Sequence, residues 1–129
     1  MNFNSLSEIA SYIVSEGKVI LAADESNTTC TKRFDSIGVE STEDNRRDYR
    51  ELLFRSEGMK GNIGGVILFD ETIRQSAADG TSLVDVITSQ GSLPGIKVDK
   101  GLQQIGHSEE SLTQGLDGLD ERLKEYYEL

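Results

Sequence analysis

The chain has 129 residues and is acidic, with 13 Lys and Arg against 23 Asp and Glu and a formal net charge of −10. This length suits one ordinary domain but is about half of the roughly 250 residues of a complete eight-stranded α/β barrel. The charge argues against a general nucleic-acid binder, and no apolar stretch approaches the roughly 18 residues of a membrane span. One Cys and one His exclude an intrachain disulfide and a typical zinc site.

The N-terminal segment predicts a helix and not a targeting signal. Apolar side chains recur at helical spacing over residues 5–16, and the basic and continuous apolar regions of a signal peptide are missing. We therefore expect a cytoplasmic protein. Residues 18–24 form a short apolar run that ends in an acid. Such a run is typical of a strand buried on both faces, and here Ile20, Ala22 and Asp24 share one face.

Two further apolar strands alternate with helices along the rest of the chain. Strands that alternate with helices imply βαβ units, right-handed crossovers and a parallel sheet, so the predicted fold class is α/β. After the first strand we expect a loop at 25–29, a helix ending at 37, a helix over 41–58, a strand at 64–69, helices at 72–77 and 82–90, a strand at 94–99, a polar loop at 101–113 and a helix at 116–127.

In the helix over 41–58, Tyr49, Leu52 and Leu53 are expected to line one face. Its arginines lie among many acids, which favours surface ion pairs over a nucleic-acid face. Cys30 has no His nearby in the sequence to activate it, so it is interpreted as a small packing residue. The arginines concerned are Arg46, Arg47 and Arg50.

Ionisable residues follow or end each predicted strand, and ligands of parallel α/β folds bind at the carboxyl ends of strands. Asp24 ends the first strand. Asp70 and Glu71 follow the second, where the preferred interpretation is that acids favour a helix N-terminus. Lys97 lies inside the third predicted strand. Two interpretations stay open for it: an ion pair with Asp99, or a position facing a polar cavity, as a phosphate ligand or an activated amine.

Ser26, Thr29 and Arg33 follow Asp24 at a strand-to-helix transition. Hydroxyls, backbone N–H groups and a guanidinium at such a place can hold a phosphate. The pattern alone is also compatible with ordinary loop hydroxyls and a solvated arginine.

Five blocks of the sequence resemble class I fructose-bisphosphate aldolases in that family's order and spacing. The resemblance implies a (β/α)₈ TIM barrel. Residues 1–129 would be a single unit, the N-terminal part of that barrel with the first three of its strands, and the barrel would be incomplete. The blocks are Gly17–Ser26 at the first strand, Ser36–Phe54 after it, Gly65–Thr72 at the second strand, Pro94–Gly101 at the third and Thr113–Leu119 at the following helix start.

This resemblance implies a lyase of glycolysis that cleaves fructose 1,6-bisphosphate reversibly into glycerone phosphate and glyceraldehyde 3-phosphate through a lysine Schiff base. It implies no metal or other cofactor, a sugar-phosphate substrate, no nucleic-acid or membrane partner, and a homo-oligomer when full length. The Schiff-base lysine would fall beyond Leu129, so we expect the 129-residue chain alone to be inactive. The alternative is a catalytically inactive, truncated half-barrel that acts only by association with a complementary chain.

Position by position, Asp24 resembles the family's active-site aspartate, which orients substrate and assists proton transfer. Ser26, Thr29 and Arg33 match its substrate-binding run around a phosphate, with Thr29 where Ser is common. Lys97 resembles the strand-three lysine that contacts substrate. Four residues depart from the small residues more common in the first of these loops: Asn27, Thr28, Cys30 and Thr31.

Overall fold

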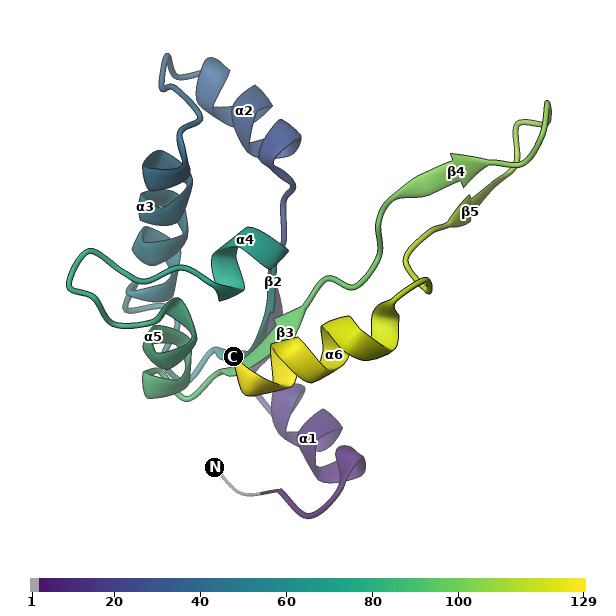
Figure 1. Ribbon diagram of the computed structural model, residues 1–129. Coiled ribbons are helices and arrows are strands. Elements are labelled where there is room, and N and C mark those ends of the chain that lie inside the picture. The colour runs from purple at the N-terminus through teal and green to yellow at the C-terminus, as the bar shows by residue number, and fades with distance from the viewer. Residues whose placement is uncertain (1–2) are drawn as a thin grey trace. The chain divides into compact units, whose positions relative to one another are not determined.

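The computed structural model describes residues 3–129 (Figure 1). Contacts within the chain divide it into two compact units, one that ends at Ile96 and one that spans Lys97–Leu129. The first unit holds a parallel sheet with its helices, and the second holds a hairpin and a helix. Among the described residues, no helix combines the length and the apolar character that a bilayer crossing requires. That residues 1–129 act as one part of a barrel stays a prediction.

The sheet of the first unit contains β1 (Val19–Ala23), β2 (Ile63–Leu68) and β3 (Leu93–Ile96). Its order is β1-β2-β3 and both pairings are parallel, which confirms the predicted α/β class. β2 has a neighbour on each side and is largely buried. In β1, however, Val19 and Ile20 are 59% and 49% exposed. The prediction that this strand is buried on both faces is wrong here, because β1 lies at an edge and has one neighbouring strand.

The helices of the first unit mostly begin at a hydroxyl cap, which accepts a hydrogen bond from the backbone N–H three residues later. Such a cap at Ser26 starts a helix inside the residues predicted as a loop at 25–29. The short helix predicted at 72–77 begins two residues earlier. In chain order the helices are α1 (Leu6–Ile13), α2 (Asn27–Asp35), α3 (Glu43–Phe54), α4 (Asp70–Ile73) and α5 (Leu83–Ser89).

The core of the first unit confirms one predicted helix face and corrects another. On α5, the predicted face of Leu83, Val86 and Ile87 is buried. On α3, Leu52 is 72% exposed, whereas Arg50 is buried together with Phe54. The predicted face of α3 is therefore wrong at Leu52, whereas Tyr49 and Leu53 are half-buried. A hydropathy pattern does not foresee an arginine that finds acceptors inside the protein.

The end of α1 packs against β2 at two adjacent glycines. A Cβ on Gly64 would lie 2.0 Å from the carbonyl oxygen of Ile13, and a Cβ on Gly65 would lie 3.2 Å from Ile13 Cγ2. The Tyr12 hydroxyl donates a hydrogen bond of 2.6 Å to the carbonyl oxygen of Gly91, just before β3. Helix and sheet can therefore approach this closely only because position 64 has no side chain.

The second unit contains an antiparallel hairpin of β4 (Leu102–Gln104) and β5 (Ser111–Thr113), followed by α6 (Leu119–Glu128). The prediction of a polar loop over 101–113 is wrong, because these two short strands pair with each other. Both are exposed at every residue, so no alternation of apolar and polar residues marked them in the sequence. The final helix begins later than predicted, after Gly118, whose φ of 67° is not helical.

We expect Gly64→Ala to lower the free energy of unfolding by about 1–3 kcal/mol, because the added methyl overlaps the backbone of Ile13. Denaturant titration followed by circular dichroism measures the change. Gly58→Ala is the matched control, since its Cβ would meet only the Ser56 hydroxyl oxygen at 3.9 Å. A Gly64→Ala variant as stable as the parent chain would show that α1 does not pack on β2 as described.

Candidate functional site

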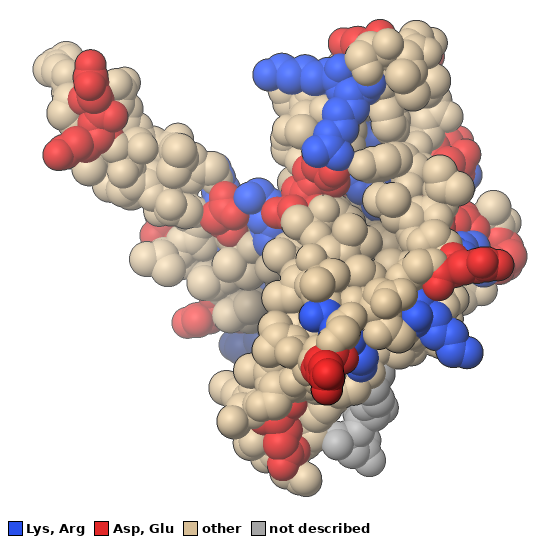
Figure 2. All heavy atoms as spheres, turned by 180° about the vertical axis from the view of Figure 1, so that it is seen from behind, with Lys and Arg blue, Asp and Glu red and all other residues tan. Residues whose placement is uncertain are grey.

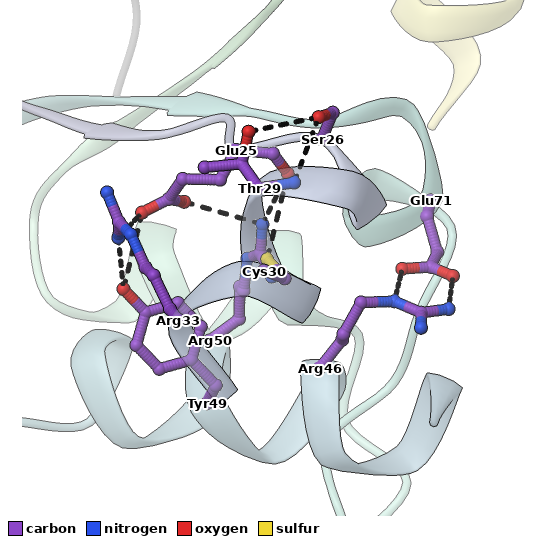
Figure 3. A network of polar contacts seen from close by, with 9 residues as sticks. All are labelled: Glu25, Ser26, Thr29, Cys30, Arg33, Arg46, Tyr49, Arg50 and Glu71. Carbon is purple, nitrogen blue, oxygen red and sulfur yellow. Dashed lines mark hydrogen bonds and ion pairs between the residues drawn. The ribbon is translucent and has the colours of Figure 1, made fainter. Parts of the chain in front are cut away.

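The carboxyl end of β1 leads through Asp24 and Glu25 directly into α2 (Figure 3). Ser26 caps α2: its Oγ accepts a hydrogen bond from the backbone N–H of Thr29, and the two hydroxyl oxygens lie 3.2 Å apart. The two hydroxyls therefore lie together at the N-terminus of a helix, one residue beyond the acidic pair. Asp24 is partly buried between the strand and this cap.

Arg33, in the last turn of α2, points back towards the start of the same helix. Its guanidinium forms an ion pair with the carboxylate of Glu25 and donates a hydrogen bond of 2.9 Å to the Tyr49 hydroxyl. The charge of Glu25 raises the pKa of Arg33, which remains a cation. The side chain of Arg33 is 53% exposed and that of Glu25 is 11% exposed. The structure thus holds the Arg33 cation at the carboxylate of Glu25, the residue before the capping Ser26.

Arg50, on α3, binds the turn between β1 and α2 from the interior of the first unit. One of its terminal nitrogens, Nη2, lies 2.8 Å from the carbonyl oxygen of Glu25 and 3.4 Å from the carboxylate of that residue. The other, Nη1, lies 2.8 Å from the sulfur of Cys30. The prediction that Arg50 forms a surface ion pair is wrong, since these acceptors let the arginine be buried. Cys30 is fully buried, which confirms its interpretation as a packing residue.

Arg46 and Glu71 join α3 to the first turn of α4. The guanidinium donates two hydrogen bonds to the carboxylate, of 2.8 Å and 2.5 Å, and a third of 2.5 Å to the carbonyl oxygen of Ser41. Hydrogen bonding from Arg46 holds the pKa of Glu71 below its ordinary value. Asp70 and Glu71 both lie in the first turn of α4, as the preferred interpretation of these acids predicts. Arg47 forms surface ion pairs, as predicted.

Lys97 lies after the end of β3, at the beginning of the second unit. Its Nζ is 2.6 Å from the carboxylate of Asp99. This hydrogen bond, more than any other contact, lowers the pKa of Asp99. Of the two open interpretations, the ion pair with Asp99 is therefore present. The guanidinium of Arg122 fixes the same segment, because it donates hydrogen bonds to the carbonyl oxygens of Val98 and Gly115.

Several charged side chains of the molecule lie in mixed groups. Figure 2 shows acidic side chains next to basic ones on one face, in keeping with the ion pairs of α3. Among residues 3–129, His, Cys, Asp and Glu side chains do not gather in any group of three that could hold a metal ion.

Three residues of this network escaped sequence reasoning: Glu25, Tyr49 as a hydrogen-bonding group, and buried Arg50. The residues that meet here are 24 or 25 positions apart in the chain, so no local spacing connects them. The sequence holds only a weak indication of these three residues. Tyr49 and Arg50 are adjacent on a helix with many charges, and Glu25 follows a strand end as Asp24 does.

Comparison with known proteins agrees with the geometry. The family described as fructose-bisphosphate aldolase class-I matches residues 5–129. Fructose-bisphosphate aldolase 1, chloroplastic, of Chlamydomonas reinhardtii is 55% identical over 123 residues, which are 95% of this chain and 33% of the relative. A probable class 1 aldolase of Xanthomonas axonopodis pv. citri is 51% identical over 130 residues, which are 100% of this chain and 39% of the relative.

A solved structure of fructose-bisphosphate aldolase from Plasmodium falciparum superposes with a TM-score of 0.92 at 51% identity, over 95% of this chain and 36% of that one. The parallel sheet of this chain therefore matches part of the fold of an α/β enzyme. The chain belongs to the class I fructose-bisphosphate aldolase family. It spans about a third of the length of the relatives that it matches.

We expect the ion pair between Arg46 and Glu71 to make stability depend on acid pH. Because the pKa of Glu71 is lower in the folded chain than its ordinary value of 4.5, the stabilisation is complete above that value and is lost as pH falls through the folded pKa. Glu71→Gln should therefore lower the free energy of unfolding by about 1–3 kcal/mol near neutral pH. The difference from the parent should shrink as the pH falls below about 4.5 and through the lower folded pKa of Glu71.

Denaturant titrations at a series of pH values test this expectation. Asp48→Asn is the control, because the Asp48 side chain is 58% exposed in its pair with Arg47, and the change should stay within about 0.5 kcal/mol. A Glu71→Gln difference that stays constant down to acid pH would contradict the assigned role.

Proposed function

We propose that this chain forms the N-terminal third of a class I fructose-bisphosphate aldolase and supplies the first three strands of its (β/α)₈ barrel. The enzyme cleaves fructose 1,6-bisphosphate reversibly into glycerone phosphate and glyceraldehyde 3-phosphate, as a lyase of glycolysis. The observation that carries the proposal is the family match over residues 5–129. The parallel order of β1, β2 and β3 supports it, since consecutive parallel strands are the repeating part of such a barrel.

Within this proposal, Asp24 is the catalytic residue of the chain. A lysine from the remaining two-thirds of the enzyme condenses with the substrate ketone, and the resulting iminium accepts the electrons of the broken carbon–carbon bond. Asp24 orients the substrate and assists proton transfer. Its place directly after the carboxyl end of β1 supports this role, because active sites of such barrels lie at that end of the strands.

The other proposed substrate contacts are Ser26, Thr29, Arg33 and Lys97. The paired hydroxyls at the N-terminus of α2 and the nearby guanidinium of Arg33 support a phosphate position there, since N–H groups, hydroxyls and an arginine favour a dianion. Lys97 would contact substrate from the end of the third strand. The proposed reaction uses no metal or other cofactor.

The remaining proposals concern partners and location. The substrate is a sugar phosphate, and neither nucleic acid nor a membrane takes part. The full-length enzyme would be a homo-oligomer. We propose a cytoplasmic location, which relatives described as cytoplasmic or cytosolic support, although other relatives are chloroplastic.

A chimera tests the proposal most sharply. In the Xanthomonas relative, this chain replaces the matching segment, which is 39% of that protein. We expect the chimera to cleave fructose 1,6-bisphosphate. Asp24→Asn should lower kcat by about 100- to 10,000-fold with little change in KM, because it removes a proton-transfer group but keeps a polar side chain.

Asp48→Asn, on the exposed side of α3, is the matched control and should leave kcat unchanged. An unaltered kcat in Asp24→Asn would remove that residue from the chemistry. A chimera that folds and does not turn over would contradict the proposed function and favour the inactive half-barrel that acts only with a complementary chain.

A further inference from the structure

The carboxylate of Glu25 is surrounded by donors from two helices (Figure 3). Arg33 of α2 forms an ion pair with it, and Arg50 of α3 lies 3.4 Å from its Oε2. The Tyr49 hydroxyl lies 3.2 Å from its Oε1 and also accepts a hydrogen bond from Arg33. One negative charge therefore faces two positive charges, and the cluster as a whole carries an excess of one positive charge.

The two arginines differ in how easily each can leave the carboxylate of Glu25. The side chain of Arg50 is 2% exposed and is also bound to the Glu25 carbonyl oxygen and the Cys30 sulfur. Its withdrawal would break several buried contacts at once. The side chain of Arg33 is 53% exposed, and it contacts the Glu25 carboxylate and the Tyr49 hydroxyl. Because water screens the exposed guanidinium, this ion pair contributes about 1 kcal/mol, less than a buried pair.

The position of the Arg33 guanidinium relative to the start of α2 also supports an exchange of partners. Side chains on a helix tilt towards its N-terminus, and Arg33 uses this direction to reach Glu25, the residue directly before the capping Ser26. The cation thus lies at the residue before the capped start of α2. Because Thr29 and Arg33 are four residues apart and share one face of that helix, an anion held at the Thr29 hydroxyl lies within reach of the Arg33 side chain.

We propose that Arg33 leaves the carboxylate of Glu25 when substrate arrives and binds the substrate phosphate instead. Arg50 and Tyr49 remain in contact with Glu25. This inference rests on the proposed phosphate position at Ser26, Thr29 and Arg33. The exchange costs little because the carboxylate keeps a buried cation and a hydroxyl donor after Arg33 leaves. A phosphate dianion in turn offers the guanidinium a bidentate, doubly charged partner. Glu25 therefore sets the phosphate affinity by competing for Arg33.

The first test observes the exchange in the unaltered 129-residue chain. Nitrogen-15 NMR of the arginine side chains is followed as fructose 1,6-bisphosphate is added, with fructose, which lacks phosphate, as the control ligand. We expect the Nε–H resonance of Arg33 to move with saturation, the resonance of Arg50 to stay in place, and fructose to cause no change. Binding that moves Arg50 as well, or that leaves Arg33 in place, would overturn the exchange.

The second test removes the competitor. Glu25→Gln should tighten the binding of fructose 1,6-bisphosphate by about three- to tenfold, because Arg33 no longer leaves an ion pair. Glu51→Gln is the matched control: Glu51 pairs with Arg55 and the net charge changes equally, so affinity should not change. If Glu25→Gln does not fold, the resonance test on the unaltered chain still decides the proposal.

A double variant separates competition from a simple loss of negative charge. In the Arg33→Met background, Glu25→Gln should no longer tighten binding, since the competition acts only through Arg33. A tightening that persists there would contradict the exchange and indicate a through-space effect. If Arg33→Met by itself leaves the affinity unchanged, the proposed phosphate position fails and the exchange fails with it. If Arg33→Met weakens binding while Glu25→Gln does nothing, only the exchange fails.

Discussion

A guanidinium that leaves water must regain its lost hydrogen bonds from fixed acceptors inside the protein. Arg50 meets this requirement at the carbonyl and carboxylate oxygens of Glu25 and at the sulfur of Cys30. These contacts determine which face of α3 is buried, and they tie α3 to the turn between β1 and α2. The backbone directly after Asp24 is therefore held by a residue 26 positions later in the chain.

The same constraint connects the fold with the proposed chemistry. Arg50 contacts the Glu25 carboxylate from the interior, and in the proposed exchange this contact remains when Arg33 leaves Glu25 for a ligand at the surface. On the other end of α3, the pair of Arg46 and Glu71 holds the start of α4, which follows β2. The two segments that leave the carboxyl ends of β1 and β2 are thus both fastened to one helix. An enzyme needs such a rigid frame to keep substrate-binding groups in place.

Sequence reasoning reached the elements whose burial follows a simple period. The apolar run of β2 and the face of α5 with Leu83 and Ile87 were predictable, since each buries apolar side chains at the spacing of its own backbone. The hairpin of β4 and β5 was not, because its strands are short and exposed and are held by backbone pairing.

The residues of the candidate site also differ in whether the sequence could predict them. Ser26 and Arg33 could be singled out because they follow a strand end and match a known family. Glu25 and Arg50 could not, because their interaction joins distant segments and is favourable only once both are buried together. The edge position of β1 also lies outside what its own residues can reveal, as it depends on how many strands stand beside it.

Amide hydrogen exchange in an Arg50→Met variant tests most directly whether this buried cation holds the turn after β1. The amide of Cys30 donates to the Ser26 carbonyl oxygen in the first turn of α2, and its exchange should accelerate by about tenfold or more relative to the amides of β2. Arg47→Met, at a more exposed arginine of the same helix, should leave both unchanged. Unaltered protection of Cys30 in Arg50→Met would contradict the account.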